Sequence, residues 1–133
     1  MQVSVLEQSV AVEGKPQHMT IQDSINLAKK VEKLGYKRFW VSEHHNHPTI
    51  IGTAPEILMA AIATQTKTIR IGSAGIMLPH YAPFKIAEQF RVLEAIAPNR
   101  IDLGLGRAPG SDGRTALALN SNSRNDSEQF PSH

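Results

Sequence analysis

The clearest sign of the fold lies in residues 68–105, which read TIRIGSAGIMLPHYAPFKIAEQFRVLEAIAPNRIDLGL. Residues 68–73 and 100–105 carry enough β-branched or alternating apolar side chains to predict two strands. Residues 84–97 have apolar side chains at helical spacing, and the Pro-Asn pair at 98–99 ends that helix. A strand, a helix and a strand in this order predict a βαβ unit with parallel strands.

The preceding residues repeat the same alternation. Strands are expected at residues 3–6 and 38–42, each followed by a helix, so the four strands start near positions 3, 37, 69 and 101. Solenoid repeats have similar periods, but these units share no consensus residues. The spacing therefore predicts consecutive βα units in one α/β domain.

The helix ends carry local signals. Thr20 with Asp23, and Thr53 with Glu56, are spaced like capping boxes, and Gly35 is well placed just after the first helix. Helical spacing predicts three buried faces: Ile21, Ile25, Ala28, Val31 and Leu34; Ile57, Leu58, Ala61 and Ile62; and Ile86, Phe90, Leu93 and Ala97.

Two architectures are consistent with consecutive parallel βα units, an α/β barrel and an open doubly wound sheet. Both place their chemistry at the carboxyl ends of the strands. The open sheet would need a dinucleotide-binding fingerprint after its first strand. The glycines at 104, 106 and 110 are one residue too widely spaced for that fingerprint and follow the fourth strand instead.

Composition narrows the function classes. The 133 residues are 41% hydrophobic and 20% charged, with no cysteine and a formal net charge of +2. Without cysteine there is no disulfide, thiolate metal site or cysteine nucleophile. The dispersed basic residues argue against nucleic acid, and no apolar run is long enough to span a membrane. No secretory signal is visible, so a cytoplasmic location is expected.

Three histidines and a glutamate follow the second predicted strand, in the segment Glu43-His44-His45-Asn46-His47. One interpretation is acid–base chemistry, because histidine titrates near neutral pH and Glu43 could fix the tautomer of a neighbouring ring. A metal site is a second interpretation, but no further ligand cluster completes it, so no metal is predicted. A solvated polar loop is the third.

Other polar or glycine-rich segments end the third and fourth strands. Arg107 stands among glycines, which let a ligand approach the backbone, and arginine can grip a phosphate with two hydrogen bonds. Ala74-Gly75 leaves room for a flat ring. The alternatives are a surface arginine on a tight turn and close helix packing. His80 and Tyr81, between two prolines, predict a rigid bend near the same rim.

Several motifs in order resemble the bacterial luciferase-like monooxygenases, in their non-luminescent branch. The motifs are VSVLEQS, WVSEHHN, GSAGIMLP and APFKIAEQFRVLEAIAPNRIDLGLGRAPG, from residue 3 to about residue 110. The resemblance implies a (β/α)8 TIM barrel of which the first four βα units are present. Residues 1–110 would be the amino-terminal half of the barrel, and residues 111–133 a long polar loop that is truncated.

The resemblance also implies roles for individual residues. His44 matches the catalytic acid/base histidine of the luciferases, with Glu43 and His45 as its motif neighbours. Cofactor contacts are implied for Ser73, Ala74, Gly75, Gly106 and Arg107. Ala74-Gly75 matches a cis peptide beneath the isoalloxazine ring, Arg107 a position associated with the flavin phosphate, and Gly106 a position where the luciferases have a reactive cysteine.

The activity implied is that of an FMN-dependent monooxygenase, with the expectation that this chain alone is incomplete or inactive because half of the barrel is missing. Reduced FMN would come from a separate flavin reductase, and O2 would oxygenate a small-molecule substrate. A deazaflavin is the alternative cofactor, and assembly with further copies of the chain is expected in this family. The competing hypotheses are a non-catalytic flavin-binding or self-assembling half-barrel and, more distantly, a metal hydrolase.

Overall fold

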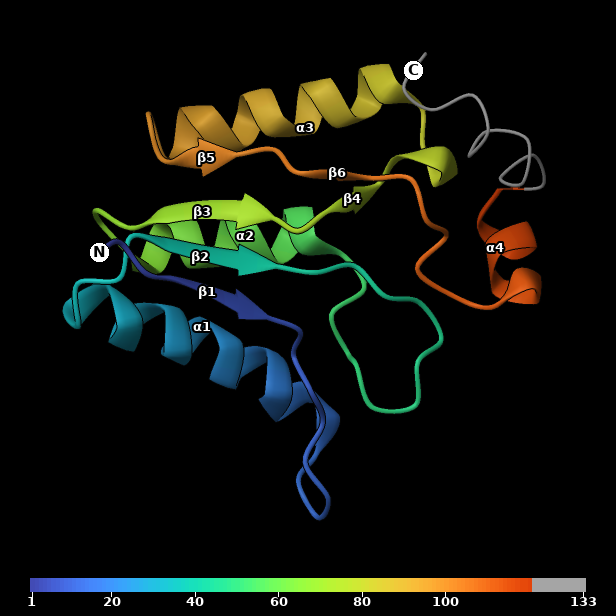
Figure 1. Ribbon diagram of the computed structural model, residues 1–133, viewed down its shortest axis with the longest axis horizontal. Helices are drawn as coiled ribbons and strands as arrows, with labels where there is room; N and C mark the ends of the chain where they lie inside the picture. The colour runs from blue at the N-terminus through green and yellow to red at the C-terminus, as the bar shows by residue number, and fades with distance from the viewer. Residues whose placement is uncertain (121–133) are drawn as a thin grey trace.

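The computed structural model describes residues 1–120, which form a parallel sheet with helices packed along it (Figure 1). The sheet has the order β1-β2-β3-β5. Its strands are β1 (Ser4–Glu7), β2 (Arg38–Val41), β3 (Arg70–Ser73) and β5 (Ile101–Asp102), and a separate pair is formed by β4 (Ile76–Met77) and β6 (Leu105–Gly106). The helices are α1 (Gln17–Lys33), α2 (Pro55–Gln65), α3 (Pro83–Ile96) and α4 (Gly113–Leu119), with a 3-10 turn η1 (Leu78–His80).

The strand order separates the two architectures left open by the sequence. Each strand pairs in parallel with the next one along the chain, and the order never reverses. A doubly wound sheet reverses at its switch point, whereas a barrel adds strands in one direction. The open-sheet alternative is therefore wrong for the described residues, which have the order of successive barrel units.

The core lies between this sheet and helices α1 to α3. Phe39 and Val41 of β2 and Ile71 of β3 are almost fully buried there, while Arg38 and Trp40 lie on the opposite face of β2. The predicted face of α3 is confirmed, since Ile86, Phe90, Leu93 and Ala97 are all buried. Burial of this face contributes about 1.5–3 kcal/mol for each large side chain.

The predicted helix starts are wrong at both capping boxes. α1 begins at Gln17 after Pro16, so Thr20 lies inside the first turns and its buried hydroxyl has no partner within residues 1–120. Asp23 pairs with Lys15 instead. α2 begins at Pro55, with Ala54 at the N-cap and no side-chain cap, so Thr53 lies outside the helix.

Two predicted core positions are also wrong. Leu34 is 74% exposed because α1 ends at Lys33, beyond which helical spacing no longer applies. Ile57 is 69% exposed because it faces outward in the first turn of α2, beside α3. The predicted helix end is confirmed, since Gly35 takes a positive φ of 84° just after α1.

The fourth predicted strand, residues 100–105, is interrupted. It forms β5 and β6, separated by Leu103 and Gly104. The cause is the side chain of Ser73 at the end of β3, whose hydroxyl donates to Gly104 O at 2.8 Å and accepts from Gly104 N at 3.0 Å. These bonds replace ladder bonds, and pairing resumes between β4 and β6.

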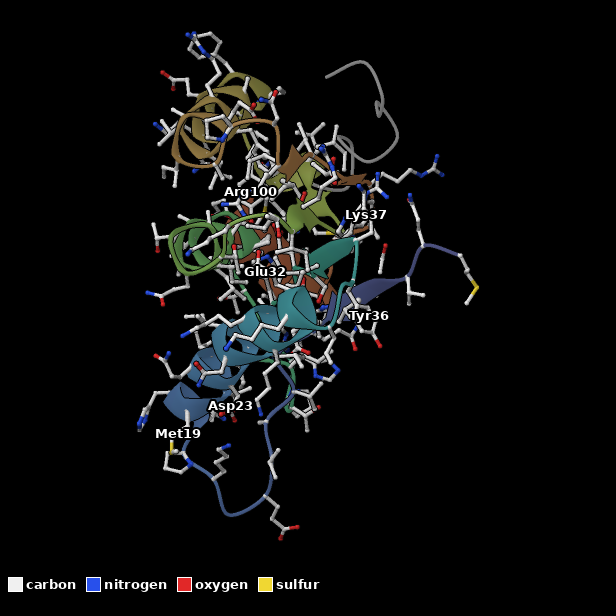
Figure 2. All side chains as sticks on the ribbon, turned by 90° about the vertical axis from the view of Figure 1, so that its left-hand side faces the viewer. Met19, Asp23, Glu32, Tyr36, Lys37 and Arg100 are labelled. Atoms are coloured by element: carbon white, nitrogen blue, oxygen red, sulfur yellow. The ribbon has the colours of Figure 1, made fainter. Side chains whose placement is uncertain are left out.

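Two charged side chains, Glu32 and Arg100, bind backbone groups at the end of the sheet where the strands begin (Figure 2). Glu32 accepts three successive backbone N–H bonds, from residues 67–69, at 2.8–3.0 Å. Arg100 donates to the carbonyls of Ala63, Thr66 and Ile69 at 3.0–3.3 Å and so caps the end of α2.

The segment after residue 110 is helical in part. Within the predicted polar loop, residues Gly113–Leu119 form α4. Hydrogen bonds from the Thr115 backbone N–H and hydroxyl lower the pKa of Asp112, the N-cap, to about 2. The remainder of the predicted polar loop, residues 121–133, lies outside the described residues.

Candidate active site

The candidate residues gather at one edge of the sheet. The arrows of β1, β2, β3 and β5 point the same way in Figure 1, and the segments that follow them meet at that side. Residues 42–47 follow β2, residues 74–75 follow β3, and residues 107–110 follow β6. This convergence is a consequence of parallel strands, and it confirms the placement expected from the sequence.

Glu43 is the centre of a buried hydrogen-bond cluster. Its side chain is fully buried, and its Oε2 lies 2.8 Å from His45 Nε2 and 2.9 Å from the Tyr81 hydroxyl, which donates to it. The Met77 backbone N–H donates to Oε1 at 3.4 Å. A buried carboxylate is tolerated only with such donors. The cluster joins the loop after β2 to the bend before α3.

The negative charge of Glu43 is felt by its neighbours. Burial raises the pKa of Tyr81, and the charge of Glu43 raises it further, so the phenol stays protonated and donates. Burial also raises the pKa of Glu56 in the first turn of α2, with a smaller contribution from Glu43. The site therefore holds two close carboxyl groups, one of them fully buried.

His44 makes no hydrogen bond to this cluster within residues 1–120. Its Nδ1 lies 3.3 Å from the Ser42 hydroxyl, and its backbone N–H donates to Gly52 O at 3.0 Å. Its ring meets that of His47 edge-on at 6.2 Å. Glu43 thus holds the ring of His45 and not that of His44.

The segment after β3 contains the cis peptide bond that the resemblance implied, between Ala74 and Gly75. Gly75 is closely packed, since a Cβ there would lie 2.9 Å from Gly104 O. The Ser73 hydroxyl is bonded on both sides to Gly104 and is fully buried, so it shapes the backbone and does not face solvent.

Arg107 lies on an exposed loop and makes no hydrogen bond or ion pair within residues 1–120. The loop itself is tied down nearby. The His45 backbone N–H donates to Gly110 O at 2.9 Å, and His80 Nε2 donates to Pro109 O at 2.5 Å. Gly106 packs against Met77, whose Cε would lie 2.6 Å from a Cβ at that position.

Sequence reasoning missed two of these contacts. It noticed His80 and Tyr81 as a bend near the rim, but not that Tyr81 bonds Glu43 or that His80 bonds Pro109. These pairs are 38 and 29 residues apart in the chain, and no local pattern predicts them. The only sequence signal was the placement of two polar rings between prolines, beside the ends of two strands.

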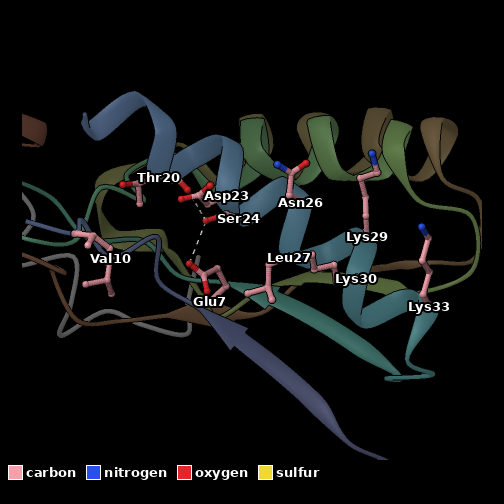
Figure 3. A pocket seen from close by; sticks show the side chains of 11 residues that line it. Glu7, Val10, Thr20, Asp23, Ser24, Asn26, Leu27, Lys29, Lys30 and Lys33 are labelled. Atoms are coloured by element: carbon pink, nitrogen blue, oxygen red, sulfur yellow. Dashed lines mark hydrogen bonds between the residues drawn. The ribbon is translucent and has the colours of Figure 1, made fainter. Parts of the chain in front are cut away.

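Two hollows of the described structure reach residues around this site, one lined by Ser42 and Gly52 and the other by Glu56. A further hollow, of about 650 Å³, lies between β1 and α1, where Ser24 bonds Glu7 and where Lys29, Lys30 and Lys33 line one side (Figure 3). It contains none of the candidate residues. Among residues 1–120, no group of three or more histidine, aspartate or glutamate side chains could hold a metal. No helix in the same range is long and apolar enough to cross a membrane.

The chain belongs to the luciferase-like monooxygenase family, whose sequence model matches residues 1–123. It is 45% identical to N-acetyl-S-alkylcysteine monooxygenase of Bacillus subtilis (strain 168) over 130 residues. This match covers 98% of this chain and 39% of that protein. It is similar to the crystal structure of apo-MsnO8, with a TM-score of 0.88, 47% identity and coverage of 94% of this chain and 38% of that one.

A second solved structure is an FMN complex. It is the oxygenating constituent of 3,6-diketocamphane monooxygenase from Pseudomonas putida, a type II Baeyer–Villiger monooxygenase. The TM-score is 0.84 at 25% identity, over 97% of this chain and 36% of that one. The chain thus spans less than two-fifths of the length of each of these relatives. It forms part of a TIM barrel, as the resemblance implied.

Proposed function

We propose that the protein is an FMN-dependent monooxygenase, which uses reduced flavin from a separate reductase and O2 to oxygenate a small organic substrate. Membership of a family of monooxygenases supports the proposal, as does the FMN bound in one similar structure. The observation that carries it is the gathering of His44, the Glu43–His45 pair and the unpartnered Arg107 at the carboxyl edge of the sheet.

Arg107 suits the phosphate of FMN. Its guanidinium is exposed, has no partner within the described range, and can donate two parallel hydrogen bonds to a phosphate. Ala74 and Gly75 place no large side chain where the resemblance puts the isoalloxazine ring, and Ser73 holds the backbone beside them through Gly104. The phosphate of a deazaflavin would suit the same arginine, so that cofactor is the alternative.

The bound reduced flavin would supply the electrons that activate O2. The part of His44 would be to hold or transfer a proton near the reacting atoms, because Ser42 occupies its Nδ1 and leaves Nε2 without a partner in residues 1–120. The buried Glu43 carboxylate would keep His45 in one orientation beside it. A positioned acid or base of this kind contributes about 10²- to 10⁴-fold in rate.

The test is the His44→Ala substitution. Product formation from an S-alkylcysteine derivative and from a cyclic ketone would be followed with reduced FMN and O2. We expect a loss of about 10²-fold or more with FMN affinity unchanged, since His44 is assigned to proton transfer and not to binding. His18→Ala, which removes an exposed histidine on α1, is the matched control and should have wild-type activity. Oxygenation that survives His44→Ala at the wild-type rate would overturn the acid–base role.

Apolar side chains left exposed favour a second function, a non-catalytic flavin-binding or self-assembling protein. Leu6 on the open face of β1 is 59% exposed, and Ile57 and Val92, which line a hollow between α2 and α3, are 69% and 60% exposed. Such side chains mark surfaces that other protein covers. The mass of the 133-residue chain by light scattering, together with an FMN titration, distinguishes this function from that of a monooxygenase. Self-association and FMN binding without oxygenation would favour this function, and Val92→Lys should then reduce the mass. The cytoplasmic location stays a prediction.

A further inference from the structure

His80 and Tyr81 form a pair that the proposed chemistry does not use. They lie where η1 ends and the chain bends toward α3, and their rings meet edge-on at 6.0 Å. Each reaches a different part of the candidate site. Tyr81 bonds Glu43 in the loop after β2, and His80 bonds Pro109 in the loop after β6.

The bond to Pro109 determines the state of the His80 ring. A carbonyl oxygen only accepts, so the proton of that bond resides on His80 Nε2, 2.5 Å away. Nδ1 is buried and has no hydrogen-bond partner within residues 1–120, and the residue is only 6% exposed. Within the described residues, the His80 side chain therefore makes one hydrogen bond, to the carbonyl of Pro109.

That carbonyl belongs to the loop that carries Arg107. Pro109 follows Arg107 by two residues, and the next residue, Gly110, accepts the His45 backbone N–H at 2.9 Å. The loop is thus held at two consecutive carbonyls, one by His80 and one by His45. Arg107 and Pro109 are themselves exposed, so little packing holds them in place.

We infer that His80 is a positioning residue for the loop 107–110, which fixes Arg107 where it can grip a phosphate. The protein's preference for a phosphorylated flavin over its unphosphorylated form then depends on a side chain that contacts neither. The inference rests on the proposed function for the identity of the phosphate ligand, but the positioning of the loop does not.

The first experiment measures the loop without any cofactor. His80→Gln keeps a donor near the position of Nε2, whereas His80→Asn is too short to reach Pro109. Amide hydrogen exchange of His45 reports the docked loop, because that N–H is bonded to Gly110 O. We expect about tenfold faster exchange in His80→Asn, the effect of one lost hydrogen bond, and near wild-type exchange in His80→Gln.

The control is the neighbouring amide of His44, which donates to Gly52 O and has no link to Pro109. Its exchange should not change in His80→Asn. If both amides accelerate alike, His80 supports the whole fold and the inference is wrong. It is also wrong if the His45 amide is unaffected, or if His80→Gln behaves like His80→Asn.

The second experiment compares the affinities of the full chain for FMN and for riboflavin, which lacks the phosphate. His80→Asn should lower the ratio of FMN to riboflavin affinity by about tenfold, and His80→Gln should restore it. Arg107→Ala separates the two claims. If Arg107→Ala leaves the ratio unchanged, the proposed phosphate role of Arg107 fails, while the exchange of the His45 amide still decides the role of His80.

Discussion

Tyr81→Phe tests the buried cluster with a change of one atom. The substitution removes the hydroxyl that donates to Glu43 Oε2 at 2.9 Å and leaves the ring in place. Because the Glu43 side chain is fully buried, water cannot replace the lost donor without opening the loop. His45 and the Met77 backbone N–H remain bonded to the carboxylate, so the carboxylate loses one hydrogen-bond donor and keeps two.

The magnitude follows from the charge and the burial of the acceptor. A hydrogen bond to a charged group contributes about 1.5–3 kcal/mol. Two other donors remain at Glu43, so we expect Tyr81→Phe to lower the free energy of unfolding by about 2 kcal/mol. Urea unfolding at pH 7, followed by circular dichroism, measures this change.

The matched control is Tyr36→Phe, since the Tyr36 hydroxyl makes no hydrogen bond within residues 1–120 and the ring packs against the core. Its effect should stay within about 0.5 kcal/mol. An effect of Tyr81→Phe no larger than that of the control would refute the argument. A second readout is ultraviolet absorbance. Burial and then the charge of Glu43 raise the pKa of Tyr81, so wild type and Tyr81→Phe should show the same tyrosinate absorbance near pH 10.

Two further predictions concern the scaffold. Burial acts to raise the pKa of Glu32, but three backbone hydrogen bonds lower it below its ordinary value of 4.5, so its contribution is complete above about pH 4.5 and is lost as pH falls through the lower, folded value. Glu32→Gln should therefore lower the free energy of unfolding by about 1 kcal/mol at pH 7, a value kept small because the carboxylate is partly exposed, and by less near pH 3. Glu88→Gln on α3 is the control and should change the free energy of unfolding little. A difference between wild type and Glu32→Gln that does not depend on pH would contradict the reasoning. A Cβ on Gly104 would lie 2.1 Å from Ser73 O, so Gly104→Ala should destabilise by about 1–3 kcal/mol or more in the same urea assay, and wild-type stability would show that the backbone there yields.

Local patterns predicted the elements better than their ends. The 3.6-residue spacing found α1, α2 and α3, because an amphipathic helix needs only its own residues to show which face is apolar. It misplaced the starts at Thr20 and Thr53, because capping signals compete with the neighbouring turn. At α1 the turn after Pro16 starts the helix earlier, and at α2 Pro55 delays it.

The interruption of the fourth predicted strand could not be predicted from local pattern, for a different reason. Residues 100–105 alternate like one strand, yet the side chain of Ser73, 31 residues away, bonds Gly104 and divides them. A partner so distant leaves no trace in the alternation. The same limit applied to the site, where the sequence indicated that Glu43 could hold a neighbouring histidine ring but could not show that this ring is His45 or that Tyr81 completes the cluster.

The sequence by itself determined the class of fold, the edge of the sheet where chemistry gathers and the residue types available there, because strand period, helix period and motif order are properties of neighbouring residues. Only the tertiary structure decided which groups meet. It joined Glu43 to His45 and Tyr81, left His44 apart beside Ser42, and tied the Arg107 loop to His80. Those contacts depend on the register of the strands and the path of the loops between them, which are set when the whole sheet packs against its helices.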